Sequence, residues 1–301
     1  MKNSLLRECA TILKGEGFRV AECSGVRSAF DTLARREDIL LVIKVLSNIE
    51  GFTAEAARKL REVASLLGAH PILVGGCMKS GSLTDNVLYE RNQVFVVSPK
   101  TLQSLVCGDI VGEFAQRGKY CVNLNASVLV DFRKSLGLTQ KQLARMLDVS
   151  PHTIYRYEHS ASMSIEVFEK LTEFLPKNRL LHNRFNVDSE PEGKPAHLSL
   201  SLTPLKREVL TSLKKMGFEA SPASAPFDVY AREMQEIYTL VSNDWRRLDH
   251  QIKVLKQVCS VLDGMGVCVS QRKTSSKGPV MSLKKLRNMD SPNQLYEFLE
   301  N

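Results

Sequence analysis

The sequence contains no long hydrophobic run. No uninterrupted apolar stretch reaches 18 residues, and the longest candidate, Ile39–Leu46, is strand-length and carries Lys44. A helix needs about 20 apolar residues to cross a bilayer, so we expect no membrane span and no membrane partner. The first residues also lack the apolar core of a secretory signal. We therefore expect a soluble, cytoplasmic protein.

Cysteine and histidine motifs are equally scarce. The seven cysteines are scattered and include no Cys-x-x-Cys pair, which argues against a zinc ribbon and a disulfide framework. The six histidines include no His-Glu-x-x-His sequence, so metal catalysis finds little support. We expect reduced thiols, no metal and no cofactor.

Acidic residues are outnumbered by basic ones. The chain has 41 basic and 33 acidic residues, a net charge of +8 that favours a polyanionic partner. Residues 1–125 carry +3, residues 126–176 carry zero and residues 177–301 carry +5. One basic cluster in the last segment comprises Arg272, Lys273, Lys277, Lys284, Lys285 and Arg287. Two interpretations of this cluster stay open: an auxiliary phosphate contact or a solvated face.

Hydrophobic periodicity divides the chain into three blocks and a linker. Residues 1–125 alternate helical patterns with short buried strands, and residues 200–301 return to that alternation. Residues 126–185 show helical periodicity alone, and the stretch 186–199, with its prolines and glycine, is typical of a linker. The expected fold is therefore a multidomain α/β (α+β) protein, with a central all-α bundle between two related α/β units.

The first block contains six well-defined patterns. Its periodicity predicts helices over Leu5–Lys14, Ala54–Leu67 and Thr101–Gln116, and strands over Ile39–Leu46, Pro71–Val74 and Gln93–Val97.

The two α/β blocks share an internal repeat. The order Gly-Phe, Phe-Asp-x-x-Ala-Arg, Ser-Asn starts at Gly17 in the first block and at Gly217 in the third. Further matches pair Pro71–Gly75 with Gly266–Val269 and Val96–Leu102 with Val280–Leu286. The conserved order favours a duplication over two unrelated units that share common turn residues.

The central block carries the strongest local signals. Val128–Leu136 is predicted to be a helix that ends at Gly137. Thr139 and Gln142 have the spacing of a capping box that opens a second helix, which runs to Leu147. After the turn at Asp148, Ser150 is expected to cap a third helix, with Pro151 at its first position. A last helix is expected at Ile165–Leu175.

This segment of about 50 residues resembles the helix-turn-helix of the Cro/repressor family. The resemblance is carried by Arg133, Gly137-Leu138-Thr139-Gln140, Leu143-Ala144, Leu147, Val149-Ser150, Thr153-Ile154 and Tyr157-Glu158. Asp148 departs from the glycine that is frequent in the family, but aspartate tolerates a left-handed turn.

The resemblance implies that residues 150–158 form a recognition helix in the major groove of DNA. The candidate DNA-binding residues are Gln140, Lys141, Arg145, Ser150, His152, Thr153, Tyr155 and Arg156. Among them, Arg156 is expected to read guanine, and Gln140 to face a phosphate together with Lys141 and Arg145. Glu158 is expected to pair with Arg133, Tyr157 to lie in the core and His159 to be a solvated helix end.

The flanking units resemble the core of the PD-(D/E)xK nucleases, which hold a divalent metal between two acids beside a lysine. Asp31 matches the first acid and Lys44 the lysine, but Val42 stands where the second acid belongs. In the second repeat Asp228 persists, and the sequence places Thr239 opposite Lys44. We expect degenerate, non-catalytic units in which Asp31 and Asp228 cap turns and Lys44 neutralises Asp31, although Glu8 could supply a carboxylate from the first helix.

The glycine-containing stretch Gly75–Gly81 invites comparison with a phosphate-binding loop. It lacks the Gly-Lys-Ser/Thr ending, because Lys79 and Ser80 precede Gly81. We expect a flexible loop after a strand.

The whole order of units resembles the archaeal helix-turn-helix transcriptional regulators over most of the chain. The resemblance implies a sequence-specific regulator that is not an enzyme, binds double-stranded DNA and acts as a homodimer, with an unknown effector. Two alternatives remain open: a metal-dependent nuclease, and a protein-interaction or antitoxin-like module.

Overall fold

The computed structural model describes residues 2–79, 81–108, 112–113, 121–123, 125–159, 162–175, 202–244, 246–271 and 278–300. The expected linker at 186–199 lies outside these residues, as do Arg272, Lys273 and Lys277 of the basic cluster. No helix within the described ranges is long and apolar enough to span a membrane. The chain divides into one compact unit of residues 1–46, 51–72 and 190–301, and a second of residues 47–50 and 73–189.

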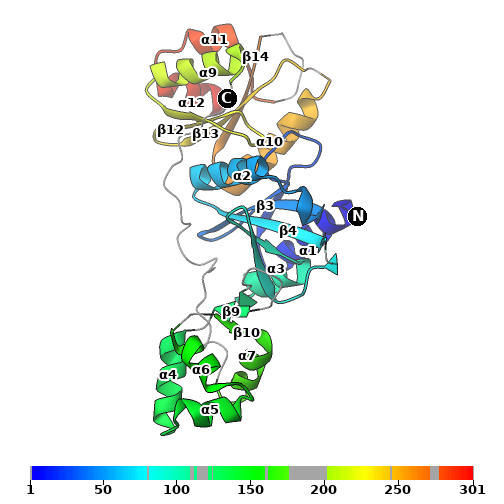
Figure 1. Cartoon of the computed structure of the whole chain (residues 1–301). Coiled ribbons are helices and arrows are strands. Elements are labelled where there is room, and N and C mark those ends of the chain that lie inside the picture. Colours follow the sequence, from blue (N-terminus) through cyan, green and yellow to red (C-terminus); the bar gives the residue numbers. More distant parts are fainter. Residues whose placement is uncertain are drawn as a thin grey trace. The chain divides into compact units, whose positions relative to one another are not determined.

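The first sheet takes its strands in the order β1-β2-β3-β4-β7-β6-β8, with β5 paired to β4. Their bounds are β1 Arg19–Glu22, β2 Thr32–Arg36, β3 Ile39–Asn48, β4 His70–Met78, β5 Gly81–Ser82, β6 Val87–Arg91, β7 Val94–Val97 and β8 Gly112–Glu113. Figure 1 labels β3 and β4 of this sheet. β1, β2 and β3 form an antiparallel meander of two consecutive hairpins.

Three helices accompany these strands: α1 at Lys2–Gly15, α2 at Ala54–Leu67 and α3 at Pro99–Val106. A short 3-10 turn, η1, lies at Ile49–Gly51. The hydroxyl of Thr53 accepts the Ala56 N–H at the start of α2, and Gly68 closes the helix in a left-handed conformation (φ 61°). Such paired caps fix both ends of a helix through local bonds alone.

The central segment is helical. It contains α4 at Ala126–Ser135, α5 at Gln140–Met146, α6 at Pro151–His159 and α7 at Ile165–Thr172, and a short ribbon that pairs β9 (Cys121–Asn123) with β10 (Ser162–Ser164). The fold class is thus confirmed: helices at 126–172 lie between two α/β regions in the chain.

The second sheet has five strands in the order β11-β12-β13-β14-β15 (Figure 1). The strands are β11 Glu219–Pro222, β12 Val229–Arg232, β13 Glu236–Val241, β14 Met265–Ser270 and β15 Val280–Ser282. The helices are α9 Pro204–Lys215, α10 Leu248–Leu262, α11 Leu283–Arg287 and α12 Pro292–Glu300. One core joins the sheet to α9, α11 and α12 through Val209, Leu213, Leu286 and Leu295.

The two α/β regions repeat the same order of elements, as the sequence repeat predicts. α1-β1-β2-β3-α2-β4 is followed in the second copy by α9-β11-β12-β13-α10-β14. Small details recur as well: Ser98 accepts the Thr101 N–H at the start of α3, and Ser282 accepts the Lys285 N–H at the start of α11. Matching caps at matching positions support a duplication.

Register corrects one detail of the repeat. The backbone N–H of Asp31 donates to the Ile43 carbonyl, and that of Asp228 donates to the Thr239 carbonyl. Thr239 is therefore the counterpart of Ile43, and Leu240 is the counterpart of Lys44. The expectation that Thr239 stands opposite Lys44 was wrong by one residue, because hydrogen bonds between strands set this register and sequence spacing does not.

Helix α10 packs against both repeats, since it contacts β1 and β2 as well as β13 and β14. At its end, Arg19 of β1 makes two hydrogen bonds to the Asp263 carboxylate, with N···O distances of 2.6 and 2.7 Å. Arg35 reaches the same carboxylate at 3.2 Å. A further bond joins the Ala29 N–H to the Ser224 carbonyl. Residues 1–46 and 51–72 of the first repeat thus share one compact unit with the second repeat.

Several predicted bounds need correction. The helix expected over Thr101–Gln116 ends at Val106, and residues 112–113 form β8, which pairs with β6. The loop expected over Gly75–Gly81 is strand through Met78. Gly75 is packed so tightly there that a Cβ would lie 2.3 Å from Ile49 Cγ2. Gly75 is therefore required for the close approach of the Ile49 side chain to β4.

Candidate nucleic-acid interface

The helices of the central segment begin and end at local signals in the sequence. The capping box at the start of α5 is formed in full: Thr139 Oγ1 accepts the Gln142 N–H, and the Gln142 side chain accepts the Thr139 N–H. Ser150 Oγ accepts the Thr153 N–H at 3.1 Å and so caps α6. Gly137 and Asp148 both adopt left-handed conformations, with φ of 63° and 56°. The turn between α5 and α6 is therefore fixed without a glycine.

A small core holds the four helices together. It contains Leu129, Leu143, Ala144, Leu147, Ile154, Tyr157, Met163, Val167, Phe168 and Leu171. Ala144 is 1% exposed, and its small side chain allows α5 and α6 to approach closely. Tyr157 is 3% exposed, as expected for a core residue. α6 thus buries Ile154 and Tyr157 and turns its other side to solvent.

A buried polar network joins three of these helices. Arg133 of α4 donates to both carboxylate oxygens of Glu158 at 2.6 and 3.2 Å, and it also donates to the Leu138 carbonyl at 3.0 Å. Gln140 of α5 donates to Glu158 at 2.7 Å. The expected pairing of Arg133 with Glu158 is confirmed.

The network sets the charge state of Glu158, whose side chain is only 3% exposed. Burial alone would raise the pKa of this carboxyl, but hydrogen bonds from Arg133 and Gln140 outweigh burial, and the net pKa lies below its ordinary value. The same bond from Glu158 raises the pKa of Arg133 against the effect of burial. Glu158 therefore stays ionised at neutral pH. Its hydrogen bond with Gln140 fixes the start of α5 against the last turn of α6.

The exposed face of α6 carries polar and aromatic side chains. His152, Tyr155 and Arg156 are all exposed, and Tyr155 keeps half of its surface open to solvent. The Tyr155 ring stacks on His159 with centroids 4.1 Å apart, and the Arg156 guanidinium lies 5.5 Å from the Tyr157 ring. His159 is thus exposed, as expected, but it also supports Tyr155.

The other candidate DNA-binding residues lie on the two helices and on the turn that joins them. Lys141 and Arg145 are exposed on α5. The hydroxyls of Ser150 and Thr153 form a hydrogen bond with each other at 2.8 Å, so each hydroxyl already has a partner within the cap. Gln140 is half-buried and shares its amide with Glu158. Sequence reasoning missed this last contact because residues 18 apart meet only after the helices pack.

The nuclease-like site of the first repeat has a different chemistry from that of a metal centre. The Asp31 carboxylate accepts from Lys2 at 3.0 Å, from Lys44 at 3.2 Å and from the Val45 N–H at 2.9 Å. The expected neutralisation of Asp31 by Lys44 is confirmed, and Lys2 is a partner that the sequence did not reveal.

The second repeat makes the same arrangement. Asp228 accepts from Lys206 at 2.5 Å and from the Val241 N–H at 2.7 Å, while Leu240 replaces Lys44. Each aspartate thus binds a lysine from the first turns of the preceding helix and a strand N–H. Lys2 lies 15 residues before Gly17 and Lys206 lies 11 residues before Gly217, so the repeat in the sequence does not align the two lysines and could not have identified them.

These residues do not fit a divalent metal. Two ammonium groups already neutralise Asp31, and Glu8 lies exposed on α1. Within the parts of the chain that the structure describes, no three acidic, histidine or cysteine side chains form a cluster that could hold a metal ion. Six cysteines with described side chains are free thiols.

Comparison with known proteins defines the class of the molecule. Residues 2–111 match the PD-(D/E)XK superfamily domain, and residues 129–179 match the helix-turn-helix family. The chain therefore combines a nuclease-like domain with a helix-turn-helix domain of the XRE type.

The relatives match this chain over nearly their full length. A protein of Thermococcus kodakarensis is 30% identical over 99% of this chain and 96% of its own length. A protein of Methanocaldococcus jannaschii is 28% identical over 100% of this chain and 97% of its own length. A protein of Pyrococcus furiosus is 30% identical over 96% of this chain and 95% of its own length. All three carry the name "Putative HTH-type transcriptional regulatory protein". The chain belongs to this archaeal family. No solved structure matches it.

Proposed function

We propose that the protein is a sequence-specific DNA-binding transcriptional regulator that places α6 in the major groove. The observation that carries the proposal is the two-sided character of α6: Ile154 and Tyr157 are buried, while His152, Tyr155 and Arg156 face solvent. The network of Arg133, Glu158 and Gln140 holds α6 rigidly against α4 and α5. A rigid helix with an exposed polar face is the element that reads base edges in helix-turn-helix proteins.

The candidate contacts divide into two groups. Arg156 has the fork of donors that pairs with guanine O6 and N7, and His152, Thr153 and Tyr155 share its helix. We assign Lys141, Arg145, Ser150 and Gln140 at the start of α5 to contacts with phosphate oxygens. Because the segment carries no net charge, its DNA affinity must come from segregating cations on one face.

We propose further that two copies associate. One helix-turn-helix covers a single half-site, so a two-fold dimer would bind half-sites about 34–36 Å apart. Support comes from large exposed apolar side chains: Leu136, Met146 and Phe174 of the helical segment are 53%, 37% and 48% exposed. Contiguous exposed apolar surface marks association sites, so the proposal requires these side chains to gather at the dimer contact. Sedimentation equilibrium would test the dimer directly.

The test of the function is selection of genomic fragments by the purified full-length protein, followed by footprinting of the enriched sites. A regulator should protect two half-sites of related sequence. If no preferred site emerges and binding does not depend on salt, the protein-interaction or antitoxin-like alternative takes the place of this proposal.

The salt dependence of binding should report on Lys141 and Arg145. We expect the double variant Lys141→Gln/Arg145→Gln to weaken binding to all sequences alike, since phosphate contacts carry no sequence information. Each lost contact should lower the slope of log K against log salt by about 0.9, so by roughly two for the pair. Fluorescence anisotropy from 50 to 300 mM salt measures this slope. An unchanged slope would place both residues away from DNA.

We propose that the nuclease-like domain does not cleave DNA, because Asp31 is neutralised by Lys2 and Lys44 and Val42 replaces the second acid. Supercoiled plasmid incubated with the protein and Mg²⁺ or Mn²⁺ should stay intact in an agarose gel assay. Cleavage by the wild type that disappears in Asp31→Ala would establish the nuclease alternative instead. Cleavage that persists in Asp31→Ala would indicate a contaminating nuclease.

A further inference from the structure

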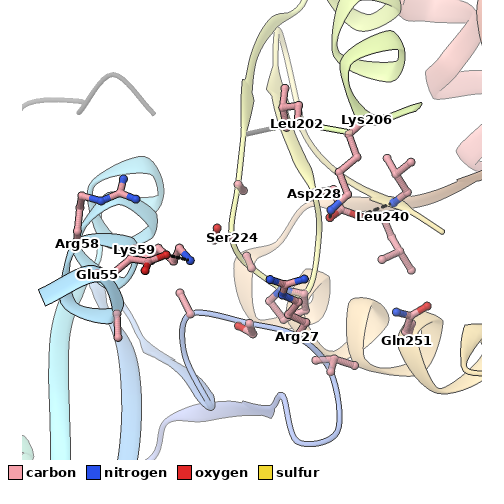
Figure 2. Close-up of a pocket in the computed structure, with 18 of the residues that line it drawn as sticks. Arg27, Glu55, Arg58, Lys59, Leu202, Lys206, Ser224, Asp228, Leu240 and Gln251 are labelled. Atoms are coloured by element: carbon pink, nitrogen blue, oxygen red, sulfur yellow. Dashed lines mark hydrogen bonds and ion pairs between the residues drawn. The ribbon is translucent and has the colours of Figure 1, made fainter. Parts of the chain in front are cut away.

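The compact unit of residues 1–46, 51–72 and 190–301 contains a pocket of about 800 Å³. Its walls come from the β1–β2 loop, α2 and β3 of the first repeat and from α9, the β11–β12 loop, β13 and α10 of the second. Figure 2 shows Glu55, Arg58 and Lys59 on one side, Lys206 and Asp228 on the other, and Arg27 and Ser224 between them. A volume of this size is typical of small-molecule sites.

Cations outnumber acids along the walls. Arg27, Lys44, Arg58, Lys59 and Lys206 line the pocket, and Glu55 and Asp228 are its carboxylates. Four of the cations have acidic partners: Lys44 pairs with Asp31, Lys206 with Asp228, Lys59 with Glu55 and Arg58 with Glu62. Arg27 is exposed and has no ion pair with any residue that the structure describes. Among the lining cations, Arg27 is therefore the one whose charge no described acidic side chain already offsets.

Two helices also begin at the pocket. Thr53, Glu55 and Ala56 at the start of α2 line it, and so do Thr203 and Lys206 at the start of α9. Each threonine caps its helix by accepting a single N–H. The remaining first-turn N–H groups and the helix dipoles favour an anion.

The pocket is asymmetric although the repeats are related. Structural equivalence pairs Asp31 with Asp228, so Arg27 and Lys44 correspond to Ser224 and Leu240 of the second repeat. The β11–β12 loop lines the pocket with small side chains from Ala223 to Pro226. Such side chains leave room for the uncharged part of a ligand beside the cations.

We propose that this pocket binds a small phosphorylated ligand of about the size of a mononucleotide, one per chain. Arg27 and Lys59 contact the phosphate from the first repeat, while Gln251 and the small side chains of the β11–β12 loop face the rest of the ligand. Asp228 and Glu55 favour a ligand that also carries hydroxyl or amino donors over a bare stretch of phosphate backbone. The site is distinct from the helix-turn-helix and does not rest on the DNA-binding proposal.

The test is isothermal titration of the full-length protein with inorganic pyrophosphate, AMP and adenosine. Pyrophosphate and AMP should bind saturably with one site per chain, and adenosine should not. The variant Arg27→Gln/Lys59→Gln should lose about tenfold or more in affinity, as expected when charge-assisted hydrogen bonds are removed. The single variant Arg27→Gln, which alters one exposed side chain, should show part of this loss.

Lys214→Gln is the matched control, because Lys214 is exposed in the last turn of α9, at the opposite end from the pocket. It should bind as the wild type does, and circular dichroism should show equal melting temperatures for all variants. Lack of saturable binding, or equal losses in the control, would overturn the proposal. Displacement of pyrophosphate by a non-specific 20-base-pair duplex would also overturn it, since the pocket would then be a contact for the DNA backbone.

Discussion

Replacing Glu158 by alanine is expected to destabilise the helix-turn-helix by about 3–5 kcal/mol, the range for breaking a buried ion pair from one side. The change leaves the Arg133 guanidinium, whose side chain is 16% exposed, without its carboxylate, and it removes the acceptor of Gln140. Hydrogen exchange measured by mass spectrometry resolves this local effect, because peptides from 126–175 report on these helices alone. Their protection should fall by roughly two to four orders of magnitude, the equivalent of that loss in free energy.

Glu169→Ala is the control for this variant, because Glu169 is exposed on α7 and its side chain has no hydrogen bond among the described residues. Its exchange should match that of the wild type. If Glu158→Ala keeps full protection, the network contributes nothing to stability and α6 is held by its apolar contacts alone.

The same carboxylate should give the segment a defined pH dependence. Because the folded pKa of Glu158 lies below its unfolded value of about 4.3, its contribution is fully present above that pH and is lost as the pH falls through the folded pKa. The variant Glu158→Gln lacks this ionisation. The difference in melting temperature between wild type and Glu158→Gln should therefore be largest at neutral pH and should shrink below about pH 4. A difference in melting temperature that does not change with pH would contradict the stabilising role of the ionised Glu158.

Replacing Arg156 by alanine is expected to weaken binding to the selected operator by roughly 5- to 150-fold, which corresponds to about 1–3 kcal/mol for a bidentate contact to guanine. Arg156 is exposed on α6, where its guanidinium lies over the Tyr157 ring. Stability should not change, because the side chain lies outside the core.

A matched set of operators separates base reading from general electrostatics. Arg156→Ala should lose affinity for the operator with its guanine intact and should lose little more when that guanine is replaced, whereas the wild type should lose affinity on replacement. Lys214→Ala, which removes an exposed charge from α9, should leave both affinities unchanged. Equal losses for Arg156→Ala on every operator would assign Arg156 to a phosphate.

The helix-turn-helix could be predicted closely from the sequence because its signals are local. Thr139, Gly137 and Ser150 act on residues within one helical turn, and the observed α5 and α6 start where these caps place them. The same holds for α2, which occupies its predicted bounds of Ala54–Leu67 between Thr53 and Gly68.

The rest depends on contacts between distant residues. β1 and β2 escaped prediction because they are four and five residues long and carry charged side chains, so their pairing partners define them. Lys2 lies 29 residues from Asp31, and Gln140 lies 18 residues from Glu158. No periodicity in the sequence predicts such pairs. The order of motifs in the repeat, by contrast, predicted the order of elements in the second repeat.

The contact of α10 with β1 and β2 has a consequence for synthesis of the chain. Arg19 and Asp263 are separated by 244 residues, so the surface that α10 covers on the first repeat stays exposed until Leu248–Leu262 has left the ribosome. Such non-local contacts slow folding and leave sheet surface open to aggregation in the meantime. The helix-turn-helix, whose core is built from residues 129–171, can close before that contact forms. The nascent chain therefore has a compact helical domain in place before its first repeat is fully covered.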